Sequence, residues 1–135
     1  MIVVATNVIA YCWIHGERTA LAHRLRRIDA DWHAPVLWRS EMRSILAGYR
    51  RDGCLDALQV RRIMAAAEAG LAGREHYLPG ERVFQVTEQS RLSAHDAEFV
   101  ALAEILGTRL VTEDRAILAA FPQRTIDVEG AVRSA

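Results

Sequence analysis

The sequence predicts an α/β fold of three layers, in which helices cover both faces of a central parallel sheet of four to five strands. Short apolar runs alternate with amphipathic segments along the whole chain. These runs are too continuously hydrophobic for one face of the sheet to meet water, which is typical of a parallel sheet between helices. The chain has 135 residues, and half of them are apolar, enough for one domain with a real core. We therefore expect a single domain over residues 1–135.

The first half of the chain is expected to contain two strands and four helices. The strands are predicted over 2–5 and 34–38, and the helices over 6–13, 16–28, 41–53 and 55–73. Pro35 lies in the second strand, and Ser40 leads into the third helix. Gly53 should end that helix, while Gly70 and Gly73 should end the alanine-rich fourth helix.

The second half repeats the alternation of strands and helices. Strands are predicted over 75–78 and 109–112, with a fifth over 124–128, and helices over 81–90, 93–107 and 113–121. The helix over 93–107 has the clearest signals, because Ser93 can cap it and Gly107 can end it. Pro122 should break the last helix.

Composition excludes several classes of protein. No stretch reaches the roughly 18 apolar residues of a membrane span, and no basic-then-apolar leader is present, so we expect a cytoplasmic protein without a membrane partner. Cys12 and Cys54 lack metal-ligand spacing and are expected to stay reduced and buried. All seventeen basic residues are arginines, so a Walker phosphate loop and a receiver-type phosphoacceptor site, which both need lysine, are excluded.

Three carboxylates lie where the predicted strands lead into helices. Glu41 follows the second strand, Asp114 follows the fourth, and Asp96 lies at the start of the helix over 93–107. Ligands of parallel sheets bind at the edge formed by the carboxyl ends of the strands, so we expect these side chains to converge there. Taken singly, Asp96 also fits a capping box with Ser93, and the other two fit a first helical turn.

Converging carboxylates favour a metal site. They repel one another, and burial raises their pKa values. A hard cation removes that repulsion, and oxygen-only ligands suit Mg²⁺ or Mn²⁺. Such an ion can activate water and neutralise charge on a phosphodiester. No histidine stands as an obvious general base: His95 neighbours Asp96 but adjacent helical residues face different ways, and His33 and His76 are expected to be structural.

Four stretches together resemble the PIN-domain family, and within it the VapC-like bacterial toxins. The family's opening "DTN" matches "VVATNVIAY", and its "SE…L" helix start matches "WRSEMRSIL". Its "S-x-x-D-A…ALA" helix matches "LSAHDAEFVALAEILG", and its "L-V-T-x-D" matches "RLVTEDRAIL". Each stretch alone is loose, but the four occur in the right order over essentially the whole chain, and together they are specific.

The resemblance implies a PIN-like three-layer α/β/α fold, a Mg²⁺ or Mn²⁺ site and endoribonuclease activity selective for single-stranded RNA. It also implies a cognate antitoxin from the same operon and, often, a homodimer. The metal-binding and catalytic positions that it assigns are Ala5, Glu41, Asp96 and Asp114, supported by Thr6, Asn7 and Thr112.

Ala5 stands where the family has its first aspartate, a residue that holds the metal directly. Losing a residue that only supports a ligand costs about 10–100-fold in metal affinity or activity, so losing a ligand should cost at least as much. We therefore expect an inactive or strongly impaired enzyme. Two origins explain Ala5. One is deliberate replacement, since an active toxin would poison its expression host, and the other is natural decay. The intact remainder of the site favours deliberate replacement.

Two other functions fit the same residues. A non-catalytic PIN-like module would only bind an antitoxin or RNA, and a structural α/β domain would use its acids as helix caps. The set of three acids and the "TN" pair disfavour the structural domain. Substituting aspartate for Ala5 separates the other two readings, because it completes the site only if the rest is catalytic.

The net charge of zero means that RNA binding would depend on local arginines. Arg39 and Arg43 flank Glu41, and Arg115 follows Asp114, so these three are the candidates. Solvated helix arginines explain them equally well. An unpaired anionic pocket also attracts a guanidinium, so we expect an antitoxin to dock over the acids.

Overall fold

The computed structural model describes all 135 residues and contains one sheet of five parallel strands in the order β3-β2-β1-β4-β5. The strands are β1 (Ile2–Val4), β2 (Trp32–Pro35), β3 (Glu75–His76), β4 (Leu110–Val111) and β5 (Thr125–Ile126). The helices are α1 (Thr6–Trp13), α2 (Thr19–Ile28), α3 (Trp38–Arg51), α4 (Ala57–Leu71), α5 (Gly80–Glu88), α6 (Ala94–Leu106), α7 (Arg115–Ala120) and α8 (Val128–Arg133). The predicted α/β class and the parallel sheet are confirmed.

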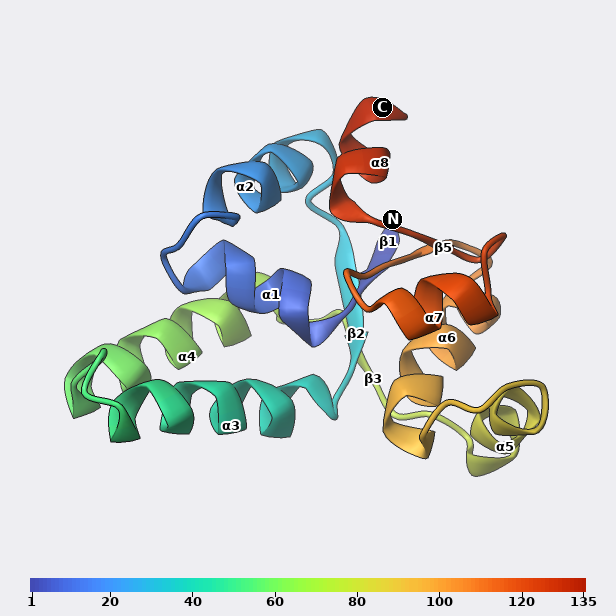
Figure 1. The fold of residues 1–135 in the computed structure, drawn as a ribbon, viewed down its shortest axis with the longest axis horizontal. Coiled ribbons are helices and arrows are strands. Elements are labelled where there is room, and N and C mark those ends of the chain that lie inside the picture. The colour runs from blue at the N-terminus through green and yellow to red at the C-terminus, as the bar shows by residue number, and fades with distance from the viewer.

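Helices form a layer on each side of the sheet. Figure 1 shows α1 to α4 on one side and α5 to α7 on the other, with α8 beside α2. The central strand β1 pairs with β2 and β4, and its Val3 and Val4 are fully buried, as are Leu110 and Val111 of β4. This two-sided burial explains why the strands are continuously apolar rather than alternating. None of the helices is long and apolar enough to span a membrane.

A tryptophan pair anchors the α1 side of the core. The Trp13 and Trp32 rings meet edge to face, with centroids 6.0 Å apart and planes at 88°. The Arg26 guanidinium lies over the Trp13 ring, 5.0 Å from its centroid. Gly70 of α4 lies directly against the same ring, so close that a Cβ there would lie 2.7 Å from Trp13 Cη2. Gly70 is the last residue but one of α4, which ends at Leu71, and Gly73 follows it with a positive φ, so the helix ends close to where the two glycines predicted.

The segment after β2 differs from its prediction. The expected strand over 34–38 begins earlier, at Trp32, and ends at Pro35, and Trp38 begins α3. The Trp38 indole is fully buried and donates a 2.6 Å hydrogen bond to Glu75 Oε1. Since an apolar run of this length suits a strand or a buried helix turn, periodicity could not separate them.

Local structure differs from the sequence prediction at three further places. Asp114 is the N-cap of α7 rather than a residue of its first turn. Helix α8 was not predicted at all; Asp127 caps it by accepting a hydrogen bond from the Gly130 N–H. Cys54 is exposed in the turn after α3, whereas Cys12 is buried as expected, and burial raises the pKa of its thiol to about 11.

Candidate active site

A cavity of about 120 Å³ lies at the edge of the sheet formed by the carboxyl ends of β1 and β4. We call it the acidic pocket. Its lining residues are Ala5, Thr6, Asn7, Glu41, Asp96, Phe99, Thr112, Asp114 and Ile117. The structure thus brings together the three predicted acids, Ala5 and all three predicted supporting residues.

The side chains of the acidic pocket come from two strand ends and two helix starts. Ala5 directly follows β1 and is the N-cap of α1, and its N–H donates to the Val111 carbonyl of β4 at 2.9 Å. Asp114 follows β4 after a two-residue link. Glu41 lies in the first turn of α3, and Asp96 lies in the first turn of α6. The alternation of parallel strands and helices therefore positions the pocket.

Hydrogen bonds orient two of the acids. The Thr6 hydroxyl donates to Glu41 Oε1 at 2.6 Å and ties α1 to α3. Asp114 Oδ1 accepts the N–H groups of Ala116 at 2.9 Å and Ile117 at 3.1 Å, and the Thr112 hydroxyl oxygen accepts the Asp114 N–H at 3.1 Å. Each supporting threonine thus fixes one carboxylate or the backbone that carries it.

No arginine or histidine forms an ion pair with Glu41, Asp96 or Asp114. Burial, followed by the charge of Asp114, raises the pKa of the Asp96 carboxyl, and the Ser93 hydroxyl and His95 offset part of that rise. The pocket therefore carries negative charge that the protein itself leaves uncompensated.

Glu98 adds to this charge and was missed by the sequence. Burial raises the pKa of its carboxyl, His95 lowers it, and the charge of Glu41 raises it again. Residues two apart on a helix do not face the same way, so nothing in the spacing from Asp96 pointed to Glu98. Glu41, at the start of α3, lies close enough to act on the Glu98 carboxyl, and this closeness of residues far apart in the chain is what the sequence does not reveal.

The donor chemistry of the pocket fits a hard divalent cation. Every polar group that lines it offers oxygen, and the buried Asn7 Oδ1 has no hydrogen-bond partner. No group of three or more His, Cys, Asp and Glu side chains is close enough to form a ready-made metal site. Since Ala5 places a methyl group in this lining, the carboxylates that line it are Glu41, Asp96 and Asp114.

Replacing Asp96 with asparagine is expected to stabilise the metal-free protein at neutral pH. The folded state raises the pKa of Asp96, so stability falls as the pH rises from the ordinary value near 3.9 through the folded value. Asp96→Asn removes that cost, and its advantage should vanish below about pH 3.9. Thermal unfolding of the variant and the unchanged chain across a pH series tests this, and Asp52→Asn, at an exposed site, is the control. Equal melting temperatures of Asp96→Asn and the unchanged chain at pH 7 would contradict the prediction.

The predicted RNA-binding arginines lie outside the pocket lining. Arg39 is committed to Glu75, to which its Nε donates at 2.6 Å and its Nη2 at 2.7 Å, and this pairing lowers the pKa of the Glu75 carboxyl. Arg43 is 3.9 Å from Glu68. Arg115 is exposed and makes no ion pair, so it stays the most available of the three.

His33 and His76, on neighbouring strands, lie within hydrogen-bond distance of each other, which agrees with the structural role expected for them. His33 Nδ1 and His76 Nε2 are 2.9 Å apart, and His33 Nε2 is 2.9 Å from Asp31 Oδ1. Neither ring lines the acidic pocket. His95 is exposed at the start of α6 and does not line it either.

Two solved structures align with the chain over nearly the full length of both chains. The crystal structure of PAE2754 from Pyrobaculum aerophilum aligns with a TM-score of 0.79 and 22% identity, covering 98% of this chain and 94% of that chain. The crystal structure of FitAcB from Neisseria gonorrhoeae aligns with a TM-score of 0.71 and 17% identity, covering 96% and 99%. No protein-family model and no curated protein matches the chain. At these identities the likeness is one of fold, and the fold is PIN-like, a three-layer α/β/α arrangement.

Proposed function

We propose that the chain is a VapC-like toxin of a toxin–antitoxin pair, a Mg²⁺- or Mn²⁺-dependent endoribonuclease whose site is impaired at Ala5. The observation that carries this proposal is the acidic pocket. It gathers Glu41, Asp96 and Asp114 without any ion-pair partner at the edge of the sheet, around the one position that lacks its acid. Helix capping alone does not account for acids from three elements that line one cavity.

The three carboxylates would hold the cation, with Asn7 Oδ1 as a further oxygen beside them. A bound Mg²⁺ or Mn²⁺ would supply an activated water and neutralise charge on the scissile phosphodiester. The protein's own contribution is orientation, because Thr6 fixes Glu41 and Thr112 holds the backbone of Asp114.

The same uncompensated charge supports a protein partner. A guanidinium from a cognate antitoxin can bind two carboxylate oxygens at once and would relieve the repulsion that a cation relieves. In this proposal the antitoxin covers the acidic pocket and competes with single-stranded RNA. A homodimer is part of the same proposal and rests on the family resemblance.

A non-catalytic binding module is the second candidate. The methyl group of Ala5 and the lack of a ready-made group of three ligands favour it. Such a module would keep the pocket as a docking point for an antitoxin or RNA and cut nothing.

Cleavage of total bacterial RNA in Mn²⁺ distinguishes the two candidates. We expect Ala5→Asp to cleave, the unchanged chain to cleave little or not at all, and Ala5→Asp combined with Asp114→Asn to lose the activity again. If Ala5→Asp binds Mn²⁺ tightly, stays folded and leaves all RNA intact, the enzyme proposal fails and the binding module stands.

A further inference from the structure

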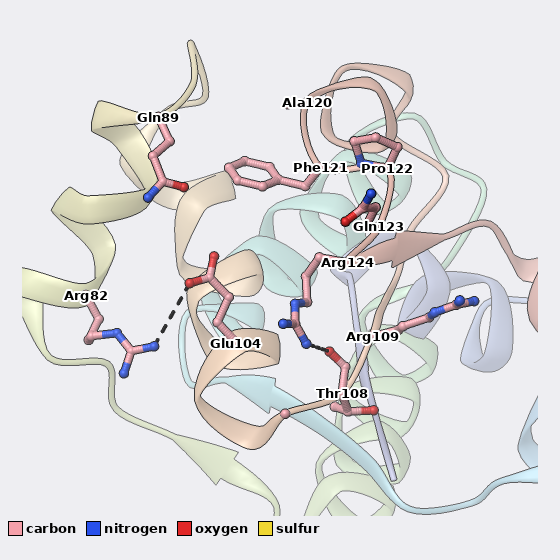
Figure 2. Close-up of a pocket in the computed structure, with 11 residues that line it drawn as sticks. Arg82, Gln89, Glu104, Thr108, Arg109, Ala120, Phe121, Pro122, Gln123 and Arg124 are labelled. Atoms are coloured by element: carbon pink, nitrogen blue, oxygen red, sulfur yellow. Dashed lines mark hydrogen bonds and ion pairs between the residues drawn. The ribbon is translucent and has the colours of Figure 1, made fainter.

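Another cavity, of about 950 Å³, lies where β4 and β5 begin, at the end of the sheet opposite to the acidic pocket. It is bounded by α5, the end of α6 and the turn between α7 and β5 (Figure 2). Arg109 directly precedes β4, whereas Thr112 of the acidic pocket directly follows it, so the two cavities lie at opposite ends of that strand. We call this second cavity the arginine cleft. Neither the sequence motifs nor the proposed activity accounts for it.

The arginine cleft concentrates positive charge in a chain whose net charge is zero. Arg82, Arg109 and Arg124 line it together with a single acid, Glu104, which gives the lining a net charge of +2. Since charge in a cleft with low-dielectric walls is focused, the cleft should attract anions that the molecule as a whole does not.

The three guanidinium groups keep donors available. Arg109 is exposed and its side chain makes no hydrogen bond or ion pair. Arg82 reaches Glu104 only at 4.0 Å, a loose pair in Figure 2. Arg124 Nη1 donates to the Thr108 carbonyl at 2.9 Å, which fixes this side chain and leaves its other N–H groups free. A planar guanidinium with free donors matches phosphate oxygens bidentately.

The rest of the lining offers the contacts that a nucleobase needs. The side-chain amides of Gln89 and Gln123 make no hydrogen bond within the protein, and each presents both a donor and an acceptor. The half-buried Phe121 ring lies between α6 and the turn that follows α7 (Figure 2). Aromatic rings bind bases of single strands by stacking, without sequence preference.

We propose that the arginine cleft binds a nucleotide unit of a single-stranded nucleic acid, with the phosphate held by the arginines and the base placed among Phe121 and the two amides. An acidic peptide would use the arginines but leave the ring and the amides without a role. A nucleotide uses all of them, whether free or within a strand.

Helix α7 connects this cleft to the acidic pocket. Asp114 caps its first turn in the acidic pocket, and its last residue, Ala120, lines the cleft. Six helical residues span about 9 Å. A strand held in the cleft could therefore continue along α7 toward the acids. That continuation rests on the proposed function, whereas binding in the cleft does not.

Fluorescence anisotropy with a labelled ten-nucleotide single-stranded RNA, in EDTA across a salt series, tests the proposal without any contribution from a bound cation. We expect Arg109→Gln and Arg82→Gln each to weaken binding several-fold and to make the salt slope shallower by about 0.7, the value for one phosphate contact on a single strand. Arg62→Gln on α4 removes an exposed arginine that makes no ion pair and should change neither. Uridine monophosphate should compete with the labelled RNA better than inorganic phosphate does.

Several results would overturn the proposal. They are unchanged binding in both cleft variants, an equal loss in Arg62→Gln, and competition by inorganic phosphate or by a ten-residue polyglutamate as strong as that by the nucleotide. Competition by both unlabelled RNA and uridine monophosphate supports the proposal. A stronger effect of RNA per nucleotide assigns the cleft to a strand, and an equal effect assigns it to free nucleotides. If the Ala5→Asp variant does not cleave RNA, the proposed function fails, but these binding results are unaffected. The two proposals can therefore fail separately.

Discussion

Replacing Ala5 with aspartate is expected to tighten Mn²⁺ binding by at least about 10–100-fold. Ala5 is 7% exposed, lines the acidic pocket and is fixed by its hydrogen bond to Val111. A carboxylate at this position therefore adds a fourth acid to Glu41, Asp96 and Asp114 without moving the backbone. Isothermal titration of both proteins with Mn²⁺ measures the gain.

The control for this substitution is Ala5→Asn, which adds a side chain of the same shape without the charge. It should gain much less affinity than Ala5→Asp. Because a fourth carboxylate in the pocket increases the repulsion, Ala5→Asp without metal should also melt at a lower temperature than the unchanged chain, and it should regain stability in Mn²⁺. Equal affinities for Mn²⁺ in the three proteins would remove the metal site from the proposed function.

Replacing Gly70 with alanine is expected to destabilise the fold by about 1–3 kcal/mol. The new Cβ would lie 2.7 Å from Trp13 Cη2, closer than real contacts allow. The Trp13 ring cannot move aside easily, because Trp32 meets it edge to face and Arg26 lies over it. Chemical denaturation of the two proteins gives the difference in the free energy of unfolding.

Gly48→Ala in α3 is the matched control, because a Cβ at Gly48 meets nothing within 4 Å. Alanine in a helix interior is favoured over glycine by about 0.5–1 kcal/mol, so this variant should gain stability. Opposite signs for the two substitutions would show that the close approach to Trp13, not the helical position, decides the outcome at Gly70. A gain in both variants would contradict the packing described for the Trp13 ring.

The sequence predicted the acidic pocket because the pocket follows from topology. Once strands and helices alternate, the residues after β1 and β4 must share one edge of the sheet, and this located Ala5 and Asp114 without any knowledge of contacts. Glu41 and Asp96 followed from helix starts at the same edge. The expectation that position 5 lacks an acid came only from the family resemblance, because an alanine carries no chemical signal of its own.

Features that depend on packing between distant elements could not be predicted. Helix α8 has only six residues, one of them a glycine, and is too short for a periodic pattern; it is held by its Asp127 cap and by α2. Nothing in the sequence indicated that Arg39 is paired, because its partner, Glu75, lies in strand β3, 36 residues further along the chain. The arginine cleft was invisible for the same reason, since α5, α6 and the turn before β5 each contribute to it.

The shortness of the outer strands bears on how the protein behaves at high concentration. Both edge strands of the sheet, β3 and β5, are only two residues long, so each edge exposes about 7 Å of extended backbone. A long, flat edge strand is a template to which a second chain can add a strand, and aggregation can begin in this way. Very short edge strands prevent such pairing. Self-association of this chain should therefore proceed through side chains on its helices, and concentrated solutions should not convert to cross-β fibres while the fold is intact.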